Sequence, residues 1–215
     1  MNFDTARFNM VEQQIRPWDV LDPKVLQLFM DIPRHLFVPP EHQHLAYMDL
    51  EVPLPHGQVM LPPKVEARML QAVDIDENER VLEVGTGSGF MTALLAKLSR
   101  DVTTVEYFAD LAEQARAKLS DFDSIKFEVG DAACDWNDGQ QYDVIILTGS
   151  CAEVPQGHLR KLNLGGRLIC TTGESPLMET WLITRVEEEN FEYESLFETE
   201  IPPLIHCEPK PHFEF

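Results

Sequence analysis

The clearest chemical signal in the sequence is a run of glycines at alternate positions. Residues 81–89 read VLEVGTGSG, so an apolar strand leads into Gly85, Gly87 and Gly89, and a helix is expected to follow. Glycine is needed where the backbone turns sharply and a ligand lies against it. Free N–H groups at the start of the helix would favour an anionic ligand group. We therefore expect Gly85, Thr86, Gly87 and Gly89 to bind a cofactor.

The spacing of the glycines distinguishes between cofactor classes. A dinucleotide loop has the pattern G-x-G-x-x-G, which would place its third glycine at position 90, where this chain has Phe90. Glu106 closes the next expected strand, where a carboxylate can accept hydrogen bonds from both hydroxyls of a ribose and would repel the ribose phosphate of NADP. Three glycines at alternate positions, with the acidic residue Glu83 on the strand just before them, resemble the pattern of the S-adenosylmethionine methyltransferase superfamily.

A third group of candidate contacts follows the third expected strand. Asp131 lies in a Gly-Asp turn there, and its carboxylate is placed to accept a hydrogen bond from the adenine amino group. Tyr107 and Ala132, the residues next to Glu106 and Asp131, complete the predicted set of cofactor contacts.

These loops require a sheet that brings them together. The apolar pattern predicts strands at residues 80–84, 102–106, 125–129, 142–148 and 167–171, with helices at 90–98 and 109–119 and a short helix that includes 159–162. Alternating strands and helices indicate a doubly wound, Rossmann-like α/β fold with a parallel sheet and helices on both faces. The carboxyl ends of adjacent strands would then form one cleft. Residues 181–186 and 193–197 are expected to add a terminal hairpin.

The N-terminal third differs from this pattern. We expect helices at residues 4–16, 22–30 and 64–73, and a rigid extended arm at 33–63, which holds seven of the fifteen prolines. Apolar residues in the arm would anchor it across a site. The hypothesis is a single domain of residues 1–215, in which a helical, proline-rich cap (1–75) covers an S-adenosylmethionine-binding core (76–215).

Composition narrows the partners and the location. The net charge of −20 over 215 residues disfavours nucleic-acid binding, because a phosphate backbone would be repelled. No apolar stretch has the length of a membrane span, and the N-terminus does not resemble a signal peptide. The four cysteines include no C-x-x-C pair, which favours reduced thiols and a cytoplasmic location. His42, His44 and His56 lack a matched ligand cluster, so no metal site is expected.

Several motifs together resemble the protein-L-isoaspartate O-methyltransferase family over nearly the whole chain. They are PRHLFVP at 33–39, AYMD at 46–49, PLPHGQ at 53–58, GTGSG at 85–89, Gly-Asp at 130–131, YDVII at 142–146 and LGGRL at 164–168. The resemblance implies S-adenosylmethionine as cofactor and isoaspartyl-containing proteins or peptides as substrates. It also implies repair of damaged proteins, in which methylation of the isoaspartyl α-carboxylate leads to a succinimide that can reopen as aspartate.

One departure from the family pattern affects the acceptor site. The family continues after Gly57-Gln58 with T-I-S-x-P, whereas this chain has VMLPP at 59–63, so Leu61 occupies the position of the active-site serine. We expect Leu61, Gly57 and Glu83 to lie near the point of methyl transfer. Because Leu61 cannot donate a hydrogen bond to a carboxylate, two alternatives stay open. One is a methyltransferase of the same fold with a small carboxylate or a more apolar acceptor, and the other is a non-catalytic cofactor-binding protein.

Overall fold

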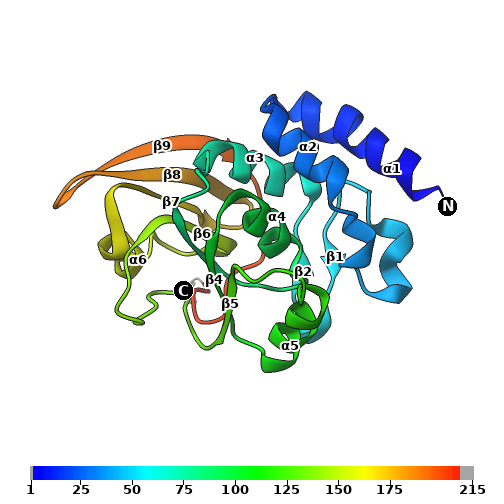
Figure 1. The fold of residues 1–215 in the computed structure, drawn as a ribbon. Helices are drawn as coiled ribbons and strands as arrows, with labels where there is room; N and C mark the ends of the chain where they lie inside the picture. Colours follow the sequence, from blue (N-terminus) through cyan, green and yellow to red (C-terminus); the bar gives the residue numbers. More distant parts are fainter. Residues whose placement is uncertain (1, 209–215) are drawn as a thin grey trace, which may run out of the picture.

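The computed structural model describes residues 2–208 and is built around a seven-stranded sheet (Figure 1). The strand order is β5-β4-β3-β6-β7-β8-β9. The strands are β3 (Arg80–Val84), β4 (Asp101–Glu106), β5 (Ile125–Val129), β6 (Tyr142–Cys151), β7 (Leu162–Glu174), β8 (Leu177–Glu187) and β9 (Asn190–Glu198).

The first five of these strands are parallel to one another, whereas β8 pairs antiparallel with both β7 and β9. β3 pairs in parallel with both β4 and β6, and it is the central strand around which the chain order reverses. The β8–β9 hairpin confirms the expected terminal hairpin and projects beyond the parallel strands (Figure 1). The doubly wound α/β sheet is thus confirmed, and the carboxyl ends of β3, β4 and β5 lie along one edge.

Helices cover both faces of this sheet. The helices of the core are α4 (Phe90–Leu98), α5 (Ala109–Lys118) and α6 (Gln156–Lys161). Phe90 of α4 packs in one apolar cluster with Val81, whereas Leu159 of α6 packs in another with Leu82. Since successive side chains of a strand point to opposite faces, α4 and α6 lie on opposite sides of β3.

The N-terminal segment forms helices and short turns against the α4 face (Figure 1). Its elements are α1 (Phe3–Met10), which continues through residues 11–18 in tighter and wider turns, α2 (Pro23–Asp31), α3 (Pro63–Val73) and a two-stranded sheet of β1 (Val52–Pro53) and β2 (Val59–Met60). Within residues 2–208, no helix has the length and apolarity needed to cross a membrane.

Two expectations about local structure were wrong. The arm at 33–63 is not extended throughout, because it contains 3₁₀ turns at 34–36, 40–45 and 55–57. Pro40 and Pro55 begin two of these turns, and proline is tolerated there because the first N–H of a helical turn has no partner. The strand expected at 167–171 begins earlier, because β7 starts at Leu162. It includes Gly165, which adopts a φ of 78° beside a register shift against β6.

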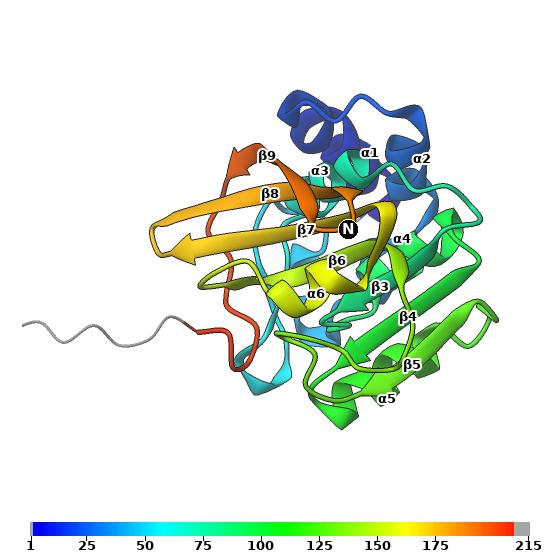
Figure 2. The same ribbon diagram turned by 90° about the vertical axis from the view of Figure 1, so that its left-hand side faces the viewer.

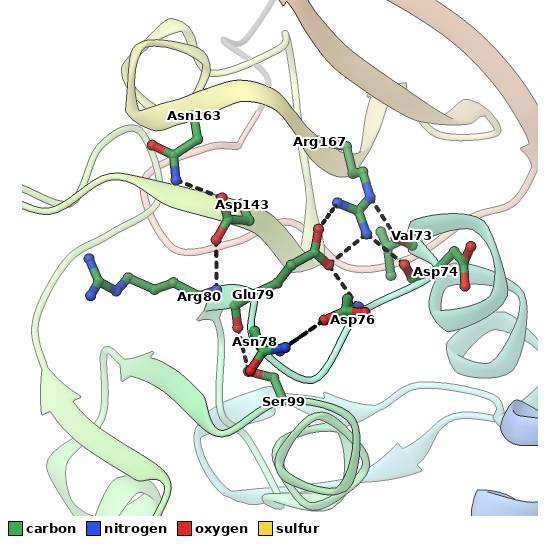
Figure 3. Close-up of polar contacts among 10 residues, drawn as sticks. All are labelled: Val73, Asp74, Asp76, Asn78, Glu79, Arg80, Ser99, Asp143, Asn163 and Arg167. Carbon is green, nitrogen blue, oxygen red and sulfur yellow. Dashed lines mark hydrogen bonds and ion pairs between the residues drawn. The ribbon is translucent and has the colours of Figure 1, made fainter.

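A polar network ties the amino ends of the strands to α3 (Figure 3). Arg167 of β7 donates to both carboxylate oxygens of Glu79 at 2.6 and 2.8 Å. It also donates to the carbonyls of Val73 at 2.6 Å and Asp74 at 2.7 Å, where α3 ends. Asp143 of β6 accepts from the backbone N–H of Arg80 at 2.8 Å. The network fixes the sheet at the edge opposite the cofactor loops.

Candidate active site

The three predicted loops line one cavity at the carboxyl ends of β3, β4 and β5. The structure therefore brings together segments that the sequence only suggested were neighbours. The cavity walls are formed by residues 58–61, Glu66, 84–88, Met91, 105–108, 130–133, 148–149 and 202–205. Figure 2 shows the last of these segments, in red, leading away from the end of β9.

The backbone conformation of the glycine loop leaves space for a ligand. Gly85 has a φ of 95°, and a Cβ atom there would lie 2.3 Å from the hydroxyl of Thr148. That hydroxyl donates to the carbonyl oxygens of Val84 at 3.0 Å and Gly85 at 2.7 Å. Gly87 has a φ of 52°, in the left-handed region. Both glycines line the cavity, so the loop presents backbone to a ligand.

Gly89 has a different position from the one expected. It does not line the cavity but precedes α4 with a φ of 84°, and a Cβ atom there would lie 3.0 Å from the Cβ of Ala115 in α5. Its absent side chain therefore allows close contact between α4 and α5. The N–H of Phe90, which we expected to be free for an anion, donates to the Ser88 hydroxyl at 3.2 Å.

Glu106 lies at the position expected of a ribose acceptor. Its carboxylate is buried in the cavity wall, where it accepts from the N–H of Gly87 at 2.8 Å and of Phe108 at 3.0 Å. These bonds fix the carboxylate between the glycine loop and the loop after β4. Tyr107 also lines the cavity and is partly exposed.

Asp131 joins the loop after β5 to the C-terminal segment. One of its oxygens accepts from the N–H of Ala133 at 3.2 Å, and the other lies 2.7 Å from Nδ1 of His206. The hydrogen bond to Asp131 raises the pKa of His206. Asp131 and Ala132 both line the cavity, as expected, and the Asp131 carboxylate already has an imidazole partner there.

Leu61 lines the cavity and is held by a buried ion pair. The guanidinium of Arg34 donates to the carbonyl of Leu61 and to the carboxylate of Glu66. Arg34 and Glu66 are both buried, and Glu66 itself lines the cavity. Burial raises the pKa of Glu66 to about 7, although the charge of Arg34 opposes this effect. The pair fixes the arm against the cavity and leaves one acid in its wall.

Two other residues predicted near the transfer point lie outside the cavity wall. Gly57 is exposed, with a φ of 69° and nothing within 4 Å of a Cβ position. Glu83 is fully buried and accepts from the hydroxyls of Thr92 at 2.6 Å and Thr104 at 2.7 Å. Glu83 lies outside because the alternation of β3 directs its side chain toward α4.

Glu83 nevertheless has an indirect link to the glycine loop. The hydroxyl of Thr104, which donates to Glu83, lies 2.6 Å from the hydroxyl of Thr86 in the cavity wall. One oxygen of Glu83 has no hydrogen-bond partner, and burial raises its pKa to about 8. Glu83 is therefore a positioning residue for Thr86 and Thr104.

Sequence reasoning missed part of the cavity wall. Glu66 was expected only as part of a helix, and Thr148 only as the end of a strand. Residues 202–205 follow β9 and return to the cavity wall. The N–H of Ser150 donates to the carbonyl of Pro202 at 2.9 Å and holds this segment there. Nothing in their sequence other than a proline pair indicates this return.

The charges in the wall fit S-adenosylmethionine better than a phosphate-bearing cofactor. Among residues 2–208, no Lys or Arg lines the cavity, whereas Glu66, Glu106 and Asp131 do. Phosphates usually bind to cations or helix N-termini. Acidic side chains instead suit ribose hydroxyls, an adenine amino group and a positively charged sulfur. Glu106 and Asp131 are the residues that would hold the nucleoside part.

Comparison with known proteins agrees with this site. The profile of the family described as Protein-L-isoaspartate(D-aspartate) O-methyltransferase (PCMT) matches residues 6–206. Proteins named protein-L-isoaspartate O-methyltransferase are 36% identical in Petrotoga mobilis, covering 95% of this chain and 98% of that protein, and 35% identical in Syntrophus aciditrophicus, covering 87% of each.

A solved structure has the same fold. It is a Plasmodium falciparum protein described as a protein-L-isoaspartate O-methyltransferase in complex with S-adenosyl-L-homocysteine. It superposes with a TM-score of 0.77 at 19% identity and covers 95% of this chain and 98% of that one. The chain therefore belongs to the protein-L-isoaspartate(D-aspartate) O-methyltransferase family of S-adenosylmethionine-dependent enzymes.

Proposed function

We propose that the protein transfers a methyl group from S-adenosylmethionine to the α-carboxylate of isoaspartyl residues in damaged proteins or peptides. The observation that carries the proposal is the single cavity shared by the glycine loop, the loops after β4 and β5, and the arm at 58–61. Family membership supports the acceptor, because the relatives carry the name of this activity.

The reaction needs few catalytic groups from the protein. S-adenosylmethionine supplies a methyl group bonded to a positively charged sulfur. An acceptor carboxylate is ionised at pH 7 and needs no general base for its attack. The contribution of the chain is to place the two reactants in line and to exclude water. Glu106 and Asp131 orient the cofactor, and the Arg34–Glu66 pair holds the arm that faces the acceptor.

The composition of the acceptor wall favours a second candidate. Val59, Met60, Leu61 and Met91 make this part of the wall apolar, and Glu66 adds an acidic group. A carboxylate therefore finds neither the serine hydroxyl of the family pattern nor a cation among the described lining residues. An uncharged acceptor of lower polarity would avoid this cost, which supports a methyltransferase with a small, more apolar substrate as the alternative.

The decisive experiment is an assay with S-adenosylmethionine that carries a labelled methyl group. The acceptor is an isoaspartyl peptide, and the matched control is its aspartyl isomer. Base-labile label on the isoaspartyl peptide alone is the expected result, since methyl esters hydrolyse in base. Cofactor binding without label on either peptide would reject the isoaspartyl acceptor and direct the search to apolar acceptors.

The Leu61→Ser variant tests the role of the arm in the same assay. A restored hydroxyl can donate to the acceptor carboxylate, so we expect a lower KM for the isoaspartyl peptide, by about tenfold for one added hydrogen bond to a charged group. The dissociation constant of S-adenosylhomocysteine, measured by calorimetry, serves as the control. An unchanged KM would show that residue 61 does not contact the acceptor.

A further inference from the structure

Three of the four cysteines meet beside the cofactor cavity, although they are far apart in the sequence. The sulfur atoms of Cys134 and Cys207 lie 3.7 Å apart. The interaction with Cys151 and burial raise the pKa of the Cys207 thiol. All of these cysteines are free thiols. The sequence predicted reduced thiols but gave no sign that they would cluster.

The two closest thiols belong to two different segments that line the cavity. Cys134 follows the loop after β5, whose residues 130–133 line the cavity. Cys207 ends a C-terminal strap, which we define as residues 201–207, and residues 202–205 of this strap also line the cavity. The ion pair between Asp131 and His206, at 2.7 Å, is a second link between the same two segments.

The strap is held to the end of β6 by backbone hydrogen bonds and by the Ser150 hydroxyl, which donates to the carbonyl of Ile201 at 2.9 Å. The N–H of Leu204 donates to the carbonyl of Ser150 at 2.9 Å, and the N–H of Ala152 donates to the carbonyl of Cys207 at 3.1 Å. Leu204 also packs against Gly149, where a Cβ atom would lie 2.9 Å from its side chain. The strap is therefore attached to the end of β6 and, through the Asp131–His206 ion pair, to the loop after β5, and its residues 202–205 form one wall of the cavity.

We propose that Cys134 and Cys207 are an oxidation site that forms a reversible disulfide with a peroxide as the oxidant, and that this disulfide locks the strap to the loop after β5 and slows cofactor exchange. The two sulfurs need to approach from 3.7 Å to about 2.05 Å, the length of a disulfide bond. A side-chain adjustment of this size is small compared with the span of either segment.

The reaction with hydrogen peroxide is balanced in two steps. The Cys134 thiolate attacks one peroxide oxygen, so that an S–O bond forms, the O–O bond breaks and hydroxide leaves as water after gaining the thiol proton. The Cys207 sulfur then attacks the sulfenic sulfur of Cys134, an S–S bond forms, the S–O bond breaks and a second water leaves. The two thiols lose two electrons in total, and the peroxide gains them.

The exposure of each thiol indicates the step in which it reacts. Cys134 is exposed and therefore meets the oxidant first, whereas Cys207 is nearly buried and can resolve the sulfenic acid. Cys151 also contacts Cys207, but both of these side chains are shielded from a peroxide in solution. Partial burial, the contact with Cys207 and the charge of Asp131 raise the pKa of Cys134. The test therefore uses a mildly alkaline buffer, in which more of the thiol is ionised.

The test measures the covalent bond and the exchange rate separately. Reduced protein is treated with hydrogen peroxide, remaining thiols are alkylated, and peptide mass spectrometry identifies the linked peptides. Stopped-flow measurements then give the dissociation rate of S-adenosylhomocysteine before and after oxidation. Cys134→Ser is the main variant, because this residue is exposed, and Cys170→Ala is the control, because within residues 2–208 the buried Cys170 thiol makes no hydrogen bond with the other cysteines.

We expect a Cys134–Cys207 peptide, a several-fold slower dissociation rate in the oxidised protein, and recovery of the original rate with dithiothreitol. Cys170→Ala keeps both effects, and Cys134→Ser loses both. Failure to form the crosslink, or a Cys151–Cys207 crosslink in its place, would overturn the site. A crosslink without a change in dissociation rate would overturn the lock.

The effect on exchange rests on the proposed cofactor cavity, whereas the crosslink does not. If S-adenosylhomocysteine does not bind to the reduced protein, the proposed function fails at its first step. In that case the mass spectrum of the oxidised protein still shows whether the disulfide forms, so the two failures are distinguishable.

Discussion

The two edges of the parallel sheet use polar residues in opposite ways. At the amino edge, Arg167 donates to Glu79 and to the end of α3, and Asp143 accepts from the N–H of Arg80, so these groups are paired within the protein (Figure 3). At the carboxyl edge, left-handed glycines replace side chains, and Glu106 faces a cavity. The amino edge is built to hold strands together, and the carboxyl edge is built to leave room for a ligand.

The comparison shows that a binding edge requires support from elsewhere. The cavity wall includes a buried ion pair, Arg34–Glu66, and the glycine loop is positioned through hydroxyls that end at the buried Glu83. Both features place a carboxyl group where burial makes its charged form costly. We therefore expect variants of the amino edge to change stability alone, and variants of the carboxyl edge to change binding or to expose these costs.

The largest effect is expected when the buried ion pair is broken. Arg34→Met leaves Glu66 buried without its partner, and we expect a loss of about 3–5 kcal/mol in the free energy of unfolding, as measured with urea at pH 7. The control is the double variant Arg34→Met/Glu66→Leu, which we expect to recover much of this loss because no unpaired charge is left. A double variant no more stable than the single one would show that packing of Arg34 over Phe90 matters more than its charge.

The next largest effect concerns Glu83, which lies between the two edges. Below pH 4.5 both the folded and unfolded states hold its proton, so it contributes nothing to the pH dependence. From there to about pH 8 the unfolded chain releases the proton while the folded protein keeps it, so stability falls as pH rises.

Glu83→Gln removes this titration. We expect the variant to be more stable than the original protein by about 3 kcal/mol at pH 8 and nearly equal to it at pH 5, as measured by urea unfolding. Glu113→Gln, at an exposed site on α5, controls for the general loss of a negative charge. Equal stability differences at the two pH values would mean that Glu83 is already ionised in the folded state.

A smaller effect tests the amino edge. Arg167→Met removes the ion pair with Glu79 and two bonds to the end of α3, so we expect a loss of about 2 kcal/mol in unfolding free energy. The dissociation constant of S-adenosylhomocysteine, from calorimetry under conditions where both proteins are folded, is expected to stay the same. Weaker binding in this variant would show that the two edges are coupled and would contradict the separate roles of the two edges.

The smallest effect in free energy is the most direct test of the carboxyl edge. Glu106→Ala removes the expected acceptor for the ribose hydroxyls, and we expect cofactor affinity to fall about tenfold, which corresponds to one charge-assisted hydrogen bond. Glu113→Ala is the matched control on the nearby helix. An unchanged dissociation constant would refute the assignment of Glu106 to the ribose.

The local pattern of the chain was sufficient to predict much of this arrangement. Alternating apolar strands and helices placed β3, α4 and β4 within a residue or two, because burial on both faces of a parallel sheet requires continuous apolar runs. The glycine loop and Glu106 could be predicted for the same reason, since they directly follow those strands. The limits of this reasoning appear at Gly89, which is needed for the close contact of α4 with α5, and at Glu83, whose carboxyl group bonds to Thr92 of α4 instead of lining the cavity.

The sequence by itself therefore determined the sheet, the loops at its carboxyl edge and the family resemblance, all of which depend on residues close together in the chain. Only the tertiary structure decided which distant groups complete the site. The Arg34–Glu66 pair, the return of residues 202–205 and the contact between Cys134 and Cys207 each join segments from different parts of the chain. Such contacts follow from the packing of the whole molecule, and no local hydrophobic periodicity in the sequence predicts them.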